Sequence, residues 1–168
     1  MSFKDTRNYS LHDKLKELNG MRVRVGIVGK SDSKLLTYAA VNEYGANIKI
    51  TTKMRKFLHW IGIHVKNETT HIVIPERSYI RSTFDNKKVF EKLRKKIQPL
   101  LKSVLNGGND AIDILDFIGL QLTSDVKRTI AEMKEPENHP VTIERKGKGK
   151  GLLVDSGRLT NAISYEVV

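Results

Sequence analysis

The sequence lacks cysteine altogether and has a single tryptophan and four prolines among its 168 residues. Without cysteine, disulfides, cysteine-ligated zinc, iron–sulfur clusters and thiol catalysis are excluded. No apolar run approaches the roughly 20 residues that a membrane-spanning helix needs, and the first residues lack the apolar core of a secretory signal. We therefore expect a soluble protein, made in the cytoplasm, with no membrane partner.

Basic residues are what the sequence has in excess. It contains 30 Lys and Arg against 19 Asp and Glu, which gives a formal net charge of +11. Such an excess favours an anionic partner, and nucleic acid is the first candidate. The length suits one domain with a sizeable hydrophobic core, and we expect residues 1–168 to form it.

The hydrophobic pattern predicts a few strands and two long helices. Apolar residues alternate with other residues in 21–27 and again in 163–167, as in strands with one buried side. Because the strands and helices do not alternate along the chain, we expect an α+β fold in which a small antiparallel sheet packs with the helices. The expected helices cover 10–20, 35–44, a long stretch at 78–105 that Pro99 kinks or divides, and 110–133.

Two segments depart from this core pattern. Residues 46–74 predict a protruding, hairpin-like arm or insertion, with strands near 63–65 and 72–74 on either side of a polar turn. Residues 144–152 are basic and rich in glycine, which predicts a flexible loop. Its lysines are candidate contacts to a polyanion, namely Lys146, Lys148 and Lys150.

Motifs for catalysis or for cofactor binding are weak. Gly29-Lys30-Ser31 follows a strand, but Arg24 stands where a phosphate-binding P-loop has its first glycine. The five histidines have no compact ligand spacing, and no Gly-x-Ser-x-Gly motif is present. The carboxylates of Asp110, Asp113 and Asp116 suit the positive end of a helix dipole. We therefore expect no enzymatic activity, no catalytic residue, no cofactor and no metal.

A dense run of basic residues falls on the first long helix, at Lys87, Lys88, Lys92, Arg94, Lys95 and Lys96. Phe90 is the one aromatic residue within this run, so no series of aromatic side chains alternates with the lysines to stack on bases. Two interpretations stay open: a solvated helix face, or a surface that meets nucleic acid or an acidic protein.

Three segments, taken in order, resemble a known family. They are Ala40-Val41-Asn42-Glu43-Tyr44-Gly45, Ile74-Pro75-Glu76-Arg77-Ser78-Tyr79-Ile80-Arg81 and Leu153-Val154-Asp155-Ser156-Gly157-Arg158-Leu159-Thr160-Asn161-Ala162-Ile163. The same order is typical of tailed-bacteriophage virion-morphogenesis proteins of the neck and tail-completion group. The resemblance covers the chain from about residue 20 to its end. It departs from the family pattern mildly, at Glu76, Tyr79, Ser156 and Ala162.

This resemblance implies a structural virion protein of the head-to-tail junction, with no catalysis. Such proteins assemble as rings, commonly of six or twelve copies, in a phage or a phage-derived tail particle. The implied partners are further copies of the chain, a portal or head-completion protein, and a tail terminator, tube or sheath protein, with non-specific contact to passing DNA. The alternative function is that of a basic nucleic-acid-binding protein.

Eight residues are candidates for the assembly interface. Phe57, Trp60 and Ile61 would be unfavourable in water, so we expect the arm to pack on a neighbouring subunit or another junction protein. Charged and aromatic groups of the family segments suit contacts within the fold or between ring neighbours. These are Glu43, Tyr44, Arg77, Arg81 and Arg158.

Overall fold

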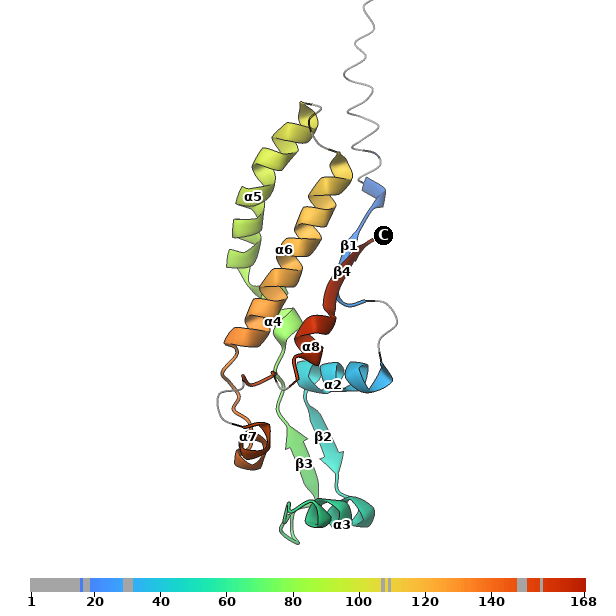
Figure 1. The fold of residues 1–168 in the computed structure, drawn as a ribbon, viewed down its shortest axis with the longest axis vertical. Helices are drawn as coiled ribbons and strands as arrows, with labels where there is room; N and C mark the ends of the chain where they lie inside the picture. Colours follow the sequence, from blue (N-terminus) through green and yellow to red (C-terminus); the bar gives the residue numbers. More distant parts are fainter. Residues whose placement is uncertain are drawn as a thin grey trace, which may run out of the picture.

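The computed structural model describes residues 16, 19–28, 32–106, 108, 110–147, 151–154 and 156–168. It has the expected α+β architecture, with two separate two-stranded antiparallel sheets. Figure 1 shows one sheet beside the two long helices and the other sheet in an arm at the far end of the long axis. Within the described part of the chain, no helix combines the length and the apolar character needed to cross a membrane.

The first sheet joins the two ends of the described chain. β1 (Val23–Ile27) pairs antiparallel with β4 (Ile163–Val167), with Val23 opposite Val167. Both strands were expected from their alternating pattern. On the outer face Arg24 pairs with Glu166 at 3.3 Å, while the apolar face packs against α6 (Ala111–Glu132).

The first long helical stretch is divided at Asn86, and the expectation of a division at Pro99 is wrong. α4 (Tyr79–Asp85) ends at Asn86, whose extended backbone and side chain begin α5 (Lys87–Leu105). The Asn86 carboxamide accepts a hydrogen bond from Lys88 N, as an N-cap does. α5 continues through Pro99, which has no N–H to donate to the helix.

The main core lies where α4, α6 and β4 meet. Its buried members are Tyr79, Val126, Ile130, Leu153 and Ile163. A second cluster joins the two long helices, around Val104 of α5 and Ile114 of α6. Tyr79 belongs to the second family segment, and Leu153 and Ile163 belong to the third, so both segments contribute to the core.

The arm is a hairpin with a helix at its end. β2 (Ala46–Lys49) pairs antiparallel with β3 (His71–Ile74), and α3 (Thr52–Trp60) lies between them. The expected strand near 63–65 is therefore wrong, because β2 takes the place opposite β3. Thr51 begins α3 by accepting a hydrogen bond from Met54 N.

Three shorter helices surround the base of the arm. α2 (Ser33–Tyr44) begins after its cap residue Asp32, and α8 (Arg158–Ala162) begins after Gly157, whose φ is 76°. α7 (Pro140–Lys146) covers the first three residues of the segment expected to be a basic loop. Pro140 at its first turn and two basic residues in its last turn favour that helix. Lys148, Lys150, Asp155, Gly29-Lys30-Ser31 and most of 10–20 lie outside the described residues.

Candidate functional site

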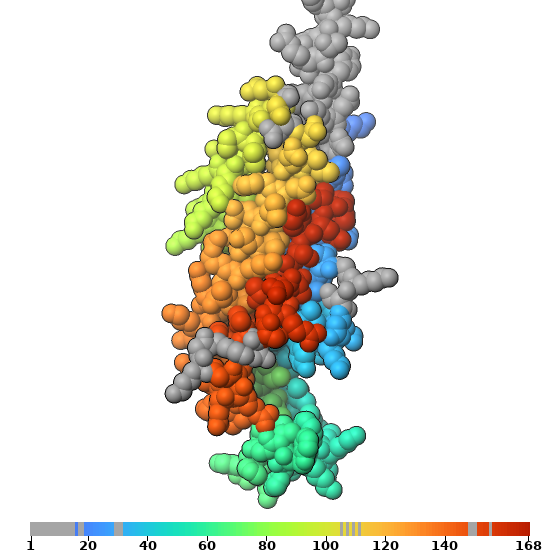
Figure 2. All heavy atoms as spheres, in the orientation of Figure 1, coloured from blue at the N-terminus to red at the C-terminus, as the bar shows by residue number. Residues whose placement is uncertain are grey.

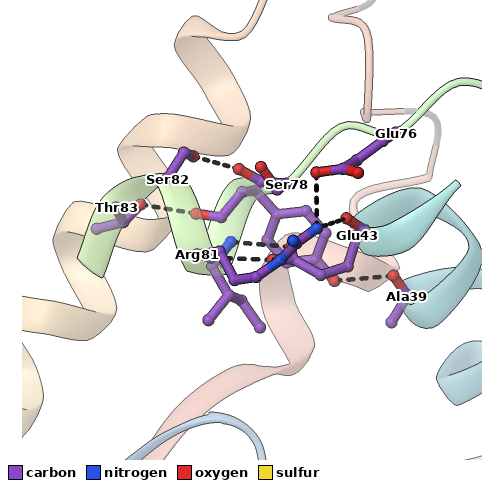
Figure 3. A network of polar contacts seen from close by, with 9 residues as sticks. Ala39, Glu43, Glu76, Ser78, Arg81, Ser82 and Thr83 are labelled. Carbon is purple, nitrogen blue, oxygen red and sulfur yellow. Dashed lines mark hydrogen bonds and ion pairs between the residues drawn. The ribbon is translucent and has the colours of Figure 1, made fainter. Parts of the chain in front are cut away.

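Glu43 connects the first two family segments at the base of the arm. It lies in the last turn of α2, and only 4% of its surface is exposed. Its carboxylate accepts hydrogen bonds from the backbone N–H of Ile80 at 3.0 Å and of Arg81 at 2.9 Å (Figure 3). These are first-turn donors of α4, whose own cap residue Ser78 makes no side-chain capping bond. Glu43 therefore caps a helix from a different part of the chain.

Arg81 contacts Glu43 and Tyr44 from the α4 side, and we call these three residues the joint. Its guanidinium donates to the Glu43 backbone carbonyl at 2.8 Å and to Glu76 Oε1 at 2.7 Å. It also lies over the ring of Tyr44, 4.8 Å from the centroid, in a cation–π contact. The exposed Tyr44 side chain thus has a defined position at the end of α2.

The joint also needs Gly45 and Arg77. Gly45 has a φ of 71°, and a Cβ there would lie 3.0 Å from both Glu76 N and Ile74 O. Arg77 is 6% exposed, and its guanidinium donates to the carbonyls of Pro136 at 2.8 Å and Glu137 at 2.9 Å. Burial lowers the pKa of Arg77 from its ordinary value. The two segments therefore fix the arm to the body of the protein.

Tyr79 gives this joint a dependence on alkaline pH. Burial and the nearby charge of Glu43 raise the pKa of Tyr79 from 10.0 to about 12. The fold favours the neutral phenol, so this contribution to stability is complete below pH 10 and is lost as the pH rises from 10 to 12. We expect the denaturation midpoint of Tyr79→Phe to fall less over this interval than that of the native chain. Urea titrations at pH 9, 10, 11 and 12 measure this, and parallel pH profiles would contradict it.

A groove of about 690 Å³ lies between α2, β3, α7 and residues 152–153 and 156–159. Its cations already have partners. Lys146 Nζ donates to Leu152 O at 2.7 Å, and Arg158 pairs with Asp32 at 3.0 Å. These contacts join the walls of the groove to one another. They therefore indicate that Arg158, in the third segment, stabilises the local fold.

The tip of the arm exposes two aromatic rings. On α3, Lys53, Lys56, Phe57 and Trp60 share one face at helical spacing, and all four are exposed. Phe57 is 55% and Trp60 80% exposed, with ring centroids 6.1 Å apart. We call these four residues the tip face. Ile61, also an interface candidate, is half-buried after the end of the helix.

Arg55 and Arg145 hold the backbone beneath the tip face. The Arg55 guanidinium donates to four carbonyls of the following loop, among them Lys66 O at 2.8 Å and Thr69 O at 2.6 Å. From α7, Arg145 donates to Ile61 O. The exposed rings therefore lie on an ordered support and not on a loose segment.

The predicted site residues divide into three groups. Glu43, Tyr44 and Arg81 meet at the joint, and two residues lie together on the tip face, with Ile61 close by in the chain. The Arg77 side chain reaches Pro136 and Glu137 and lines the groove. Arg158 lies apart, at the groove with Lys146. The sequence did not indicate the role of Arg55, and its only signal there was a basic side chain in the arm. The full grouping is the joint (Glu43, Tyr44, Arg81), the tip (Phe57, Trp60, Ile61) and the groove (Arg77, Arg158, Lys146).

No protein-family model, curated protein or solved structure matches this chain. Among the described residues, no group of three or more His, Cys, Asp or Glu side chains is arranged to hold a metal ion.

Proposed function

We propose that this protein is a structural subunit of the head-to-tail junction of a tailed phage or a phage-derived tail particle. Copies assemble as a ring that joins the head or portal side to the tail, and the chain has an assembly role with no reaction. The observation that carries the proposal is the tip face, because it presents an aromatic pair at the end of an ordered arm.

Exposed aromatic pairs of this kind are typical of interaction surfaces. Large apolar side chains gathered in one patch mark contact sites, and aromatic anchors contribute much of the binding energy at protein interfaces. The first two family segments build the joint that orients the arm. The first two segments and the exposed surface thus lie at the two ends of the same arm (Figure 1).

Immunogold electron microscopy tests this function. Antibodies to the purified chain are applied to the tailed particles produced by the source of the sequence. Gold is expected at the head-to-tail junction, and mass spectrometry of the same particles should detect the chain. Particles without the chain, or gold confined to another part of the particle, would overturn the proposal.

One observation favours nucleic-acid binding as a second candidate. The basic side chains of α5 form an exposed surface with a single acidic residue, Glu91, on the helix. A function based on duplex DNA requires submicromolar affinity that falls steeply with salt. Fluorescence anisotropy with labelled duplex at 50 and 200 mM salt measures it. The exposed basic set comprises Lys87, Lys88, Lys92, Arg94, Lys95 and Lys96.

A further inference from the structure

We propose that the tip face of one copy docks on the first half of α6 of a second copy. The acceptor surface, which we call the α6 stripe, consists of Ile112, Asp113, Asp116 and Leu120. The inference rests on the proposed function, because it supplies the contact between copies that a ring requires. Both surfaces are therefore occupied by other copies of this chain.

The tip face is cationic as well as aromatic. The nine residues of α3 include Lys53, Arg55 and Lys56 and no carboxylate. Arg55 is turned to the loop carbonyls, which leaves the two lysines beside Phe57 and Trp60 on the exposed face. A partner for this face must therefore offer apolar side chains flanked by negative charge.

The α6 stripe has that complementary chemistry. Ile112 is 45% and Leu120 60% exposed, and with Asp116 between them they follow each other at four-residue intervals along the helix. Asp113 is exposed beside Ile112 and accepts a capping hydrogen bond from Asp110 N at 3.1 Å, which leaves its second oxygen for a partner. Asp116 is half-buried beside Tyr165 of β4. Residues 111–120 contain these two carboxylates and no basic residue. In the docked pair, the aromatic rings of the tip face cover Ile112 and Leu120, and its lysines lie opposite the aspartates of the α6 stripe. The contact thus buries apolar side chains of both surfaces and pairs their opposite charges.

One copy cannot make this contact with itself. The tip lies at one end of the long axis, and α6 begins towards the other end (Figures 1 and 2). Each copy therefore offers one donor and one acceptor surface to different neighbours. Repetition of such a heterologous contact gives a ring where the rotation closes.

Nucleic acid is the competing occupant of the tip face, because lysines beside aromatic rings also suit stacked bases. The α6 stripe favours the second copy, since its carboxylates repel phosphate while its exposed Ile112 and Leu120 still need cover. A second copy covers both apolar surfaces, whereas nucleic acid covers one.

Engineered cysteines test the contact directly, because the native chain has none. We expect the double variant Lys56→Cys/Leu120→Cys to form a ladder of covalent oligomers under mild oxidation or with a short bismaleimide. The matched control, Lys56→Cys/Lys95→Cys, has its second thiol on the exposed face of α5. A ladder no longer than that of the control would overturn the proposal.

Trp60 provides a second readout as the sole tryptophan. Its emission should shift to shorter wavelength as protein concentration rises and the ring leaves water. Leu120→Glu should remove this shift, and the control Leu101→Glu, at another exposed leucine, should retain it. Emission that is independent of concentration but quenched by single-stranded DNA would overturn docking in favour of nucleic acid.

These results separate the inference from the proposed function. Gold at the junction together with no specific cross-link would overturn the docking and leave the junction function standing. A specific ladder from a chain that is absent from the particles would support the docking and overturn the junction function.

Discussion

Replacing Glu43 with alanine is expected to lower the free energy of unfolding by about 2–4 kcal/mol. The substitution removes the acceptor for two backbone N–H groups at the start of α4 and for Arg81 Nε. The site is 4% exposed, so little water is available to replace the carboxylate. The joint between arm and body weakens together with the α4 terminus. Urea denaturation followed by circular dichroism measures the loss.

Two variants make this result specific. Glu43→Gln keeps one acceptor oxygen and should lose about half as much stability as the alanine variant. Glu76→Ala removes the other carboxylate that contacts Arg81, but that side chain is 52% exposed, and a loss below about 1 kcal/mol is expected. If the Glu43→Ala and Glu76→Ala variants were equally stable, Glu43 would not be the cap of α4.

Gly119→Ala is expected to destabilise the protein by about 2–4 kcal/mol, although alanine is the better helix former by about 1 kcal/mol. A Cβ at Gly119 would lie 2.5 Å from Cγ and 2.7 Å from Cε2 of Tyr165. Ordinary contacts between carbon atoms are about 3.5–4.0 Å. α6 would have to move away from β4, and the main core would open. Thermal and urea denaturation should both report the loss.

The double variant Gly119→Ala/Tyr165→Ala isolates the cause. In the Tyr165→Ala background the added methyl group meets space, so Gly119→Ala should become neutral or stabilising. Gly151→Ala serves as the comparison, because a Cβ there makes only an ordinary contact of 3.4 Å with Val154. Equal destabilisation by Gly119→Ala in both backgrounds would rule out the Tyr165 clash.

Local periodicity explains how much of the fold could be predicted. The α+β class, the strands at 21–27 and 163–167 and the two long helices follow from apolar residues that repeat at intervals of two or of three to four. The break at Asn86 was missed because Pro99 is the stronger generic helix breaker, whereas an asparagine cap depends on the backbone turn around it. β2 was missed although its residues alternate between apolar and polar, because a run of four residues is too short to separate a strand from a loop by periodicity.

The candidate site was harder to predict because its contacts are distant in sequence. Glu43 and Arg81 could be selected as charged residues at helix ends. The capping of α4 by Glu43 could not be predicted, since the carboxylate accepts from a donor 37 positions away in the chain. Arg77 similarly finds carbonyls 59 and 60 positions away. Exposure of Phe57 and Trp60 depends on which α3 face packs on the arm, and periodicity alone did not indicate it.

Pairing of β1 with β4 is expected to be a late step in folding, because it joins residues far apart in the chain. Arg24 and Glu166 are 142 positions apart, so this ladder closes a longer loop than the other strand pairing of the described residues, β2 with β3. Both the arm and the α5–α6 pair rely on nearer neighbours and are expected to form first, because closing a short loop loses less entropy. During synthesis, the α6 face that holds Val126 and Ile130 therefore remains without its sheet until β4 has left the ribosome.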